Sequence, residues 1–386
     1  MHRTVNTIET PCFDRNLVQS PAGSPGPRSL MRRLLLLLTA AVLCVRPSAR
    51  AQGLVFDLFE QYLEPLRVQA GIPGLAAAIV GTDGILWEHA YGHQDVAGSM
   101  ATRMDTPFHA GGLTETITAA LVLGCVEDRR LSLDDRAGDF LPSSPEADAT
   151  IRQLLTHTSG PPENLTFAYR PERLDPLKAA IRACTENSFR ESLANRLAEL
   201  VMFDSVPGPD VVNLAPPAEG IPSASDRDRY QRVLLRLATP YAIDGRGRAS
   251  VAQYGAATLT PSDGLVTTVR DFAKFDVALR QGSIIRAETL NAAWSSPIGR
   301  GGQPLPHGMG WFVQTYNGET IVWQFGVSAG AGSSLMVTLP SKGLTLILMA
   351  NSDRLVRPLP LSDGDVTVSP FARVFFNLFS KLGTGR

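Results

Sequence analysis

Glu115 is a carboxylate in the first turn of a predicted helix, where an acid can serve three different purposes. The simplest is to complement the helix dipole, which is worth roughly a few tenths of a kcal/mol. If it is buried instead, its pKa would rise and it could act as a general base that activates water. A third role is ligand binding. Gly112, at the mouth of the same helix, has no side chain to react, but free backbone N–H groups point outward there.

Serine and histidine occur elsewhere in patterns that resemble hydrolase sites. The pentapeptide GVSAG around Ser328 matches G-x-S-x-G, the nucleophile elbow of α/β-hydrolases. That motif needs a following helix and a later histidine, whereas SSLMVTLP is predicted to be a strand and the last histidine is His307. His157 and Ser159 lie too close in sequence to face each other, and His109 is expected to be a packed or surface residue. None of these residues is expected to be catalytic.

The helix that carries Glu115 is predicted from one apolar stripe that begins just after Gly111-Gly112. Its members recur at the spacing of one helix face: Leu113, Ile117, Ala120, Leu121 and Gly124. After the helix come the segment RRLSLDD, an FLP turn and IRQLLTHTSG.

The order of these segments resembles the serine β-lactamase-like family, which includes class C β-lactamases, D-alanyl-D-alanine carboxypeptidases and family VIII esterases. Its members read roughly F-x-x-x-S-x-x-K at the helix start, then G-x-L-x-L-D-D, a proline and L-L-T-H-T-S-G. Here the frame that begins at Phe108 reads FHAGGLTE. Gly112 therefore stands at the position of the family's serine nucleophile, and Glu115 at that of its lysine.

Two further family motifs are altered in the same register. Tyr169 matches the tyrosine of the family's Y-x-N motif, but Pro171 replaces its asparagine. The third motif, K-T-G or H-x-G on the strand that lines the pocket, reads Gln324-Phe325-Gly326. Gln324 can donate and accept hydrogen bonds but carries no charge with which to hold a carboxylate. Of the side chains that carry out the family's chemistry, only the tyrosine matches.

The resemblance implies that the family's reaction has been lost. In the family, the lysine takes the proton of the serine hydroxyl at a helix N-terminus that favours the developing negative charge. Glu115 has the wrong charge for this, and it would repel the carboxylate of a penicillin or a D-Ala-D-Ala peptide. The backbone N–H groups of Gly112 and Val327 occupy the positions of the family's oxyanion hole and do not depend on side chains. In a serine hydrolase that has lost its catalytic side chains, such a hole together with substrate binding still accelerates the reaction by about 10³- to 10⁴-fold over water.

We therefore expect a pseudo-hydrolase that binds a small acyl, peptide or ester-like ligand in the old pocket, or a protein partner on its surface. The alternative is a working hydrolase of the esterase, β-lactamase or D-Ala carboxypeptidase type. It would use a non-standard residue such as Glu115, Thr114 or Ser328. If the pocket is otherwise intact, the pair Gly112→Ser and Glu115→Lys should give measurable acylation.

The composition limits the other classes of function. The formal net charge is -1, so the chain offers no basic field for nucleic acid. The four cysteines have no C-x-x-C spacing, and there is no His/Cys ligand cluster, so neither a metal site nor a cofactor is expected. Cys125 and Cys184 fall in two predicted helices. We expect two buried thiols there in preference to a bridge.

Residues 31–51 have the layout of a secretory signal peptide. Two arginines precede an apolar run that is too short for a stable membrane span, and Ala-Arg-Ala before Gln52 is a cleavage site. Cys44 follows a leucine, which disfavours a lipoprotein anchor. Residues 1–30 are expected to be a mistaken upstream start or disordered. The mature protein would be secreted or periplasmic, without a membrane span.

The mature chain, 52–386, is predicted to be one β-lactamase-related domain of the α/β (α+β) class. The two ends of the chain, 52–105 and 305–386, would form an antiparallel sheet flanked by helices, with a helical part inserted at 106–304. The Asp83-Gly84 pair predicts a hairpin between the first two strands.

Two other segments complete the prediction. SPFARVFFNLFSKLG is expected to form a final amphipathic helix that covers one face of the sheet. The segment 204–255 is rich in Pro, Gly, Asp and Arg and weak in periodicity, so we expect a long, partly ordered excursion over the pocket.

Overall fold

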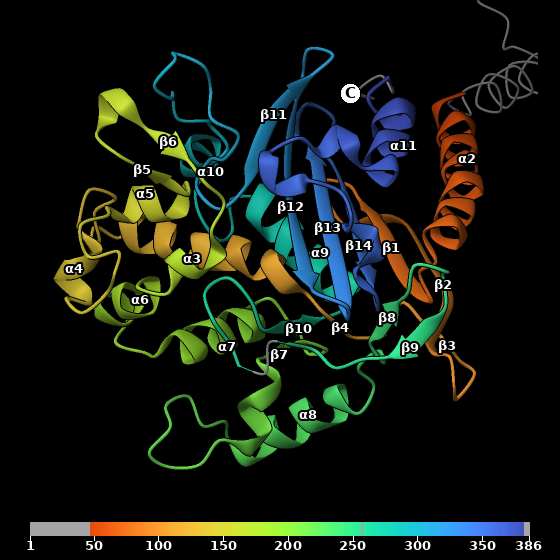
Figure 1. The fold of residues 1–386 in the computed structure, drawn as a ribbon, viewed down its shortest axis with the longest axis horizontal. Helices are drawn as coiled ribbons and strands as arrows, with labels where there is room; N and C mark the ends of the chain where they lie inside the picture. Colours follow the sequence, from red (N-terminus) through yellow and green to blue (C-terminus); the bar gives the residue numbers. More distant parts are fainter. Residues whose placement is uncertain (1–46, 256–257, 382–386) are drawn as a thin grey trace, which may run out of the picture. The chain divides into compact units, whose positions relative to one another are not determined.

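A seven-stranded antiparallel sheet is the centre of the fold (Figure 1). The computed structural model describes residues 47–255 and 258–381, and the residues from Leu54 onward form one compact unit. The strand order β11-β12-β13-β14-β1-β2-β3 confirms the expected sheet from both chain ends, which meet where β1 pairs with β14. The strand bounds are β1 (Gly74–Val80), β2 (Ile85–Asp95), β3 (Met100–Ala101), β11 (Phe312–Tyr316), β12 (Glu319–Ser328), β13 (Gly332–Leu339) and β14 (Leu344–Ala350).

The alternation of side chains along β1 divides the interior into two cores. Successive side chains of a strand point to opposite faces of the sheet. Leu75 and Ile79 therefore lie in one core and Ala78 and Val80 in the other, and every residue of β1 is buried. Strands buried on both faces become continuous apolar runs, which is why GLAAAIV and LTLILMA are recognisable as strands.

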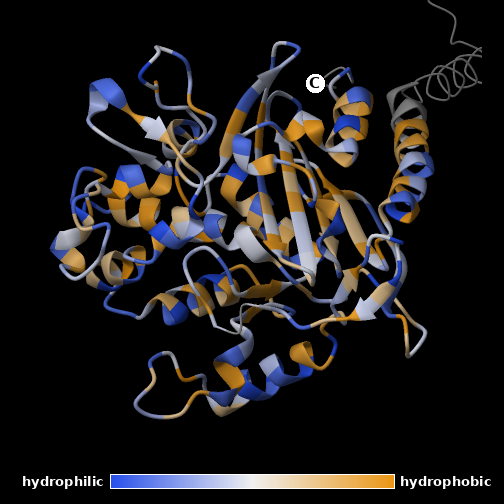
Figure 2. Cartoon of the chain, in the orientation of Figure 1, coloured by the Kyte–Doolittle hydropathy of each residue, from blue (hydrophilic) through white to orange (hydrophobic). Residues whose placement is uncertain are grey.

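Helices cover both faces of the sheet. On one face α2 and α11 supply aromatic side chains such as Phe59 and Phe375. On the other face α9 packs on β1 and β14, and α3 belongs to the same core. Figure 2 shows hydrophobic and hydrophilic residues alternating along α2 and α11. The helix bounds are α2 (Pro47–Ala70), α3 (Thr114–Glu127), α4 (Ala137–Phe140), α5 (Ile151–Leu155), α6 (Leu177–Thr185), α7 (Phe189–Glu199), α8 (Ala224–Leu234), α9 (Val269–Arg280), α10 (Ala287–Ala293) and α11 (Pro370–Phe379).

The final helix is confirmed, and its start follows from local capping. The Ser369 hydroxyl accepts the N–H of Ala372, and Pro370 occupies the first helical position, where its missing N–H has no cost. The predicted hairpin is confirmed as well, since β1 and β2 are adjacent and antiparallel.

The prediction for 204–255 is wrong in part, because the segment contains regular structure. It holds α8 and a two-stranded hairpin, β8–β9. Only Tyr230 and Val233 are buried in α8, so its apolar face is too narrow to show as a periodic pattern. The remaining strands are β4 (Phe108–His109), β5 (Thr158–Ser159), β6 (Thr166–Phe167), β7 (Val206–Pro207), β8 (Tyr241–Ile243), β9 (Ala249–Val251) and β10 (Leu265–Thr267).

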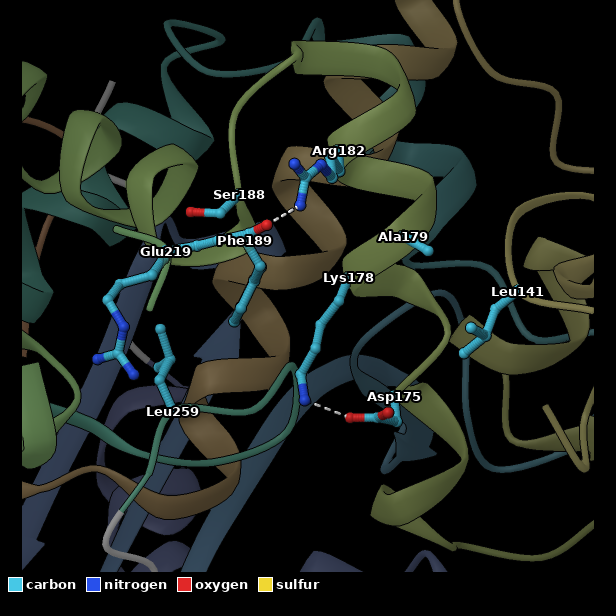
Figure 3. Close-up of a pocket in the computed structure, with 10 residues that line it drawn as sticks. Leu141, Asp175, Lys178, Ala179, Arg182, Ser188, Phe189, Glu219 and Leu259 are labelled. Carbon is cyan, nitrogen blue, oxygen red and sulfur yellow. Dashed lines mark hydrogen bonds and ion pairs between the residues drawn. The ribbon is translucent and has the colours of Figure 1, made fainter. Parts of the chain in front are cut away.

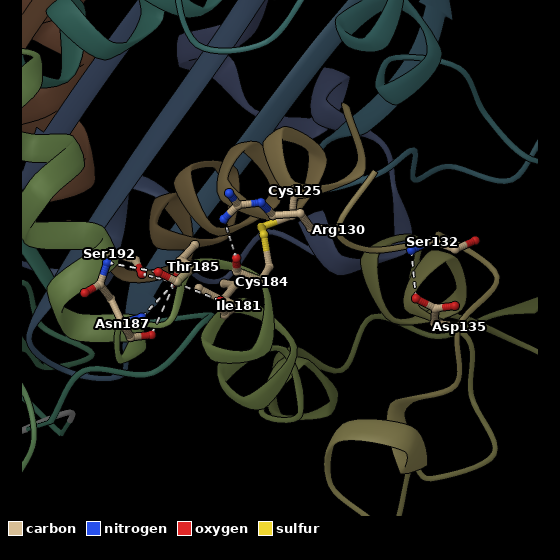
Figure 4. Close-up of a disulfide and its surroundings, with 9 residues drawn as sticks. All are labelled: Cys125, Arg130, Ser132, Asp135, Ile181, Cys184, Thr185, Asn187 and Ser192. Carbon is tan, nitrogen blue, oxygen red and sulfur yellow. Dashed lines mark hydrogen bonds between the residues drawn. A yellow bond between two sulfur atoms is a disulfide. The ribbon is translucent and has the colours of Figure 1, made fainter. Parts of the chain in front are cut away.

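The expectation of two free thiols at Cys125 and Cys184 is wrong, because they form a disulfide between α3 and α6 (Figure 4). Their Cα atoms are 6.0 Å apart, within the range that a bridge requires. Arg130 donates to the carbonyl of Cys184 at 3.0 Å, which adds a second link at the same place. The sequence places each cysteine on a helix, but it does not say that these two helix faces meet.

Most of the predicted signal peptide, including Cys44, lies outside the described residues, as do residues 1–30. The described structure begins with α2 at Pro47, so a helix crosses the predicted cleavage site. Among the described helices, none combines the length and apolar character that crossing a membrane would need.

Candidate functional site

Helix α3 is buried on nearly all sides, and this places Glu115 in the protein interior. All residues from Thr114 to Leu123 are buried. The sequence predicted one apolar face, whereas the structure buries the other faces of this helix as well. The 3-10 turn Gly111–Leu113 (η1) leads into α3. Glu115 is 0% exposed. It is therefore a buried acid and not a surface residue that only complements the helix dipole.

Three side chains from different parts of the chain converge on the Glu115 carboxyl group. The Tyr169 hydroxyl donates to its Oε1 at 2.9 Å. Gln324, on β12, donates through Nε2 to its Oε2 at 3.2 Å, and His157 Nε2 lies 3.3 Å from the same oxygen. We call these four residues the Glu115 cluster. It joins α3 to the sheet and to the segment that follows α5.

The neighbours of the cluster fix the direction of each hydrogen bond. The backbone N–H of Arg170 donates to His157 Nδ1 at 3.3 Å, so the proton of a neutral imidazole sits on Nε2 and points at Glu115. The N–H of Phe325 donates to Gln324 Oε1 at 2.9 Å, which turns the amide nitrogen toward Glu115. Glu115 therefore faces three donors and no cation.

Burial dominates the protonation of the cluster. It raises the pKa of Glu115 to about 8, against the lowering effect of the Tyr169 hydrogen bond. Burial, with the positive charge of Arg173, lowers the pKa of His157 to about 3, so this histidine is neutral. Burial and the Glu115 charge raise the pKa of Tyr169 well above its usual value. Tyr169 thus keeps its proton and cannot act as a base.

Gly112 is held so close to β12 that no side chain fits there. A Cβ atom at this position would lie 2.4 Å from the carbonyl oxygen of Phe325 and 3.3 Å from the Tyr169 hydroxyl. The first distance is far below any real carbon–oxygen contact, and the obstacle is backbone, which cannot rotate away. The sequence led us to expect acylation by the pair Gly112→Ser and Glu115→Lys if the pocket is otherwise intact. The contact with the Phe325 carbonyl shows that this condition is not met.

The two backbone segments that carry the expected oxyanion-hole N–H groups pack directly against each other. A Cβ atom at Gly111 would lie 2.9 Å from the nitrogen of Val327, and one at Gly326 would lie 2.7 Å from the nitrogen of Gly112. The carbonyl oxygen of Ala110 encloses Gly326 further, since it would lie 2.2 Å from a Cβ atom there. Glycine is required at these positions because the backbones approach so closely.

The other residues considered as nucleophiles are engaged elsewhere. The Thr114 hydroxyl is buried, donates to the Gly111 carbonyl at 2.7 Å and accepts the N–H of Leu265 at 3.3 Å. Ser328 accepts the N–H of Gly255 at 3.3 Å, and the strand β13 follows it, as the sequence predicted, so there is no nucleophile elbow.

Pro171 and His109 were also named from the sequence. Pro171 begins a 3-10 turn directly after Arg170 and has no polar side chain. Of the two expectations for His109, packed or on the surface, the first is confirmed, because the residue is buried. Its Nδ1 lies 3.5 Å from Asp263 Oδ1, and its ring stacks on that of Tyr254.

Sequence reasoning missed His157 and His307 as site residues. His157 was considered only as a partner of Ser159, and no motif marks His307. Its Nδ1 lies 2.7 Å from the Gly308 carbonyl, and its ring centre is 4.7 Å from that of His157. Only the folded chain brings these rings together.

Glu115, His157 and His307 each offer one possible metal-ligand atom, and these atoms lie within 4.8 Å of one another. The expectation that the chain has no histidine ligand cluster is therefore wrong. The residue types would suit Zn²⁺. However, coordination through His157 Nε2 would move its proton to Nδ1, where it would oppose the N–H of Arg170. The hydrogen-bond pattern of the described cluster thus fits a metal-free site better.

A separate cavity of about 430 Å³ lies on the helical part, beside α6 and α7 (Figure 3). Its rim carries two ion pairs, Lys178 with Asp175 and Arg182 with Glu219, and its walls include Phe189. No residue of the Glu115 cluster lines it. The cavity therefore combines both signs of charge with an apolar surface.

Known proteins match most of the described chain. The family model described as Beta-lactamase matches residues 57–360. Penicillin-binding protein 4* of Bacillus subtilis (strain 168) is 22% identical over 313 residues, which cover 72% of this chain and 68% of that protein. Penicillin-binding protein 4 of Amycolatopsis lactamdurans is 36% identical over 108 residues, and the chain spans only 28% of its length. An unguisins hydrolase of Aspergillus campestris (strain IBT 28561) is 23% identical, over 73% of this chain and 59% of that protein.

Solved structures share the fold at low sequence identity. The octameric penicillin-binding protein homologue from Pyrococcus abyssi has a TM-score of 0.64 at 18% identity, covering 80% of this chain and 75% of that one. The D-alanine carboxypeptidase AmpC from Burkholderia cenocepacia has a TM-score of 0.62 at 18% identity, covering 85% and 99%. Together with the family match over 57–360, the fold shows that this chain belongs to the β-lactamase family.

Proposed function

We propose that this protein does not acylate substrates by the serine route of its family and acts instead by binding. The observation that carries the proposal is the position of Gly112, where a Cβ atom would lie 2.4 Å from the Phe325 carbonyl oxygen. The chain lacks the nucleophile and also has no room for one. The Glu115 cluster supports the same interpretation, because the Glu115 carboxyl group is buried and its hydrogen-bonding neighbours are side chains of the protein itself.

The ligand we propose is a small peptide- or acyl-like molecule, with a protein partner as the second possibility. The cavity beside α6 and α7 supports the first choice. Its two ion pairs offer both a cation and an anion to the charged ends of a peptide, and its apolar wall suits a side chain. The names of the relatives, penicillin-binding proteins and a hydrolase of the unguisins, agree with a peptide-like ligand class.

We further propose that the protein works outside the cytoplasm, in the periplasm or secreted. The disulfide between Cys125 and Cys184 supports this, because such bonds persist in oxidising compartments. The predicted signal peptide at 31–51 supports it independently.

Covalent labelling tests the loss of acylation. Purified protein is incubated with a fluorophosphonate probe and with fluorescent penicillin, beside a working family member as positive control. We expect label on the control and none on this chain. A labelled band, with the modified residue located by peptide mass spectrometry, would contradict the proposal and would name the nucleophile that we have not identified.

The alternative is a hydrolase in which Glu115 activates water. The raised pKa of Glu115, about 8, is the observation in its favour, because a general base works best near the ambient pH. Its complete burial argues against it, since water has no access to the described carboxyl group. Turnover of a chromogenic short-chain ester that rises with pH toward 8 and disappears in Glu115→Gln would establish this alternative.

A further inference from the structure

A second cavity, of about 550 Å³, lies between the end of α2, the segment after β14 and the start of α11. Figure 1 shows α2 and α11 on the same side of the sheet. Its wall combines polar and apolar surface. The apolar part includes Phe371, which belongs to the core between the sheet and these helices, and Leu66 and Leu359, which pack against that core. The volume is in the range of small-molecule sites. None of its lining residues belongs to the Glu115 cluster or to the cavity beside α6 and α7.

Three arginines surround this apolar wall, and none of the lining residues is acidic. Arg373, on α11, is exposed and has no ion pair with any described residue. Arg357 is 58% exposed, and its Nη1 lies 3.5 Å from Asp353 Oδ2, a long contact that leaves its other donors available. Arg354 donates only to backbone carbonyls, those of Ile243 at 2.8 Å and Asp244 at 3.2 Å.

Two acidic residues that contact these arginines, Asp353 and Asp244, also bind other groups. Asp353 Oδ2 also accepts the N–H of Gly330 at 2.8 Å. The Asp244 side chain pairs with Arg248 at 2.8 Å and accepts two backbone N–H groups. The cavity therefore keeps an excess of positive charge next to its apolar surface.

We infer that this cavity binds a soluble anionic amphiphile, meaning a carboxylate or phosphate headgroup on a short aliphatic chain. The guanidinium fork matches the oxygen pairs of both headgroups. Arg357 and Arg373 would hold the headgroup at the rim, and Leu66, Leu359 and Phe371 would contact the chain. This site and its ligand are independent of the proposed loss of acylation at Gly112.

Calorimetric titration of the full chain tests the inference with decanoate and decyl phosphate, each below its critical micelle concentration. Decanol, which lacks the charge, and inorganic phosphate, which lacks the chain, are the matched probes. We expect both amphiphiles to bind at least about tenfold more tightly than either matched probe, because each supplies only half of the interaction. Raising the salt concentration should weaken binding of the amphiphiles.

Variants identify the site. Arg357→Gln combined with Arg373→Gln should weaken decanoate binding by about tenfold for each guanidinium removed. Arg232→Gln, an exposed arginine on α8 far from the lining residues in sequence, should leave binding unchanged. Leu359→Trp should abolish binding by filling the cavity, with circular dichroism to verify that the variant is folded.

Four results would overturn the inference. One is wild-type protein that does not bind either amphiphile at millimolar concentration. Another is equal binding by wild type and the double arginine variant. The third is binding of decanol as tight as that of decanoate, which would make the site a general apolar one. Binding confined to anionic phospholipid vesicles, with none to the soluble amphiphiles, would also count against it.

Discussion

The carbonyl oxygen of Phe325 lies 2.4 Å from the point where a Cβ atom of residue 112 would stand. In this family the corresponding residue carries the reactive hydroxyl, so the strand that should line the pocket instead occupies the place of the nucleophile's side chain. The loss of acylation that we propose would therefore be built into the backbone of two elements, η1 and β12, and would be more than the absence of one hydroxyl group.

Gly112→Ser should destabilise the protein and should not restore acylation. The added side chain forces η1 away from β12, which we expect to cost about 1–3 kcal/mol in the free energy of unfolding. The same result is expected when Glu115→Lys is added. Denaturant unfolding and fluorescent penicillin labelling measure the two effects. Gly124→Ser is the matched control, because a Cβ at Gly124 meets nothing within 4 Å. Acylation of Gly112→Ser would show that the backbone yields easily.

Glu115→Gln should not lower the free energy of unfolding at pH 7 and should raise it if the amide fits. With a pKa of about 8 the folded wild type holds Glu115 protonated, and glutamine is the neutral isostere of that form without the cost of taking up a proton on folding. Urea unfolding of the two proteins at pH 7 measures the difference. Glu288→Gln, at an exposed position on α10, should have little effect. A clear loss of stability in Glu115→Gln at pH 7 would mean that the folded protein holds Glu115 ionised.

Stability should fall as the pH rises from about 6.5 to 8, and Glu115 should cause the fall. Its pKa is about 8 in the folded protein, against 4.5 for a solvated glutamate, so over this range the folded state holds a proton that the unfolded state has released. The loss is at most about 1.4 kcal/mol per pH unit. Urea midpoints between pH 6 and 9 measure it. In Glu115→Gln this slope should disappear, and a slope that persists would assign it to another group.

His157 should act in the opposite direction at lower pH. Its pKa is about 3 in the folded protein, against 6.5 for a solvated histidine, so between these values the unfolded state binds the extra proton. Its contribution to stability is fully present above about 6.5 and is lost as the pH falls toward 3. His157→Gln should be less sensitive to acid than wild type in unfolding experiments between pH 6.5 and 4, whatever its stability at pH 7.

Replacing both Cys125 and Cys184 by serine should lower the free energy of unfolding by about 4 kcal/mol. The bridge closes a loop between residues that are 59 positions apart, and the lost loop-closure entropy of the unfolded chain sets this magnitude. Thermal or denaturant unfolding with and without a reducing agent measures it. The reducing agent should shift the wild type and leave the double variant unchanged, whereas equal behaviour of the two proteins would show that the bridge is absent.

The strands and the final helix could be predicted from the sequence because their signals are local. Apolar runs such as LTLILMA, turns such as Asp83-Gly84 and the cap at Ser369 are each complete within a few residues. Helix α8 was missed because only two of its residues face the core. The motif frame placed Gly112 and Glu115 at a helix start, and they lie in η1 and in the first turn of α3. That these positions are altered relative to the family stays a prediction.

The partners of Glu115 could not be predicted, because they lie 42, 54 and 209 residues away in the chain. Tyr169 and Gln324 were expected near the pocket from the family frame, but nothing in their spacing says that they would bond to a carboxyl group. His157 and His307 meet only after folding. The close packing of β12 against Gly112 could not be predicted either, because it depends on the distance between two main-chain segments, which residue types do not indicate.

The pairing of β1 with β14 has a consequence for how the protein is made. Leu75 is opposite Ala350, and the N–H of Gly74 donates to the Asn351 side chain at 2.7 Å. One edge of an early strand thus stays open until nearly the whole polypeptide has been synthesised, and loop closure over that separation is slow. A chain cut short before residue 344 would expose an apolar strand edge, which is a template for aggregation. The pairing that joins the two halves of the central sheet can therefore form only after residues 344–350 have been made.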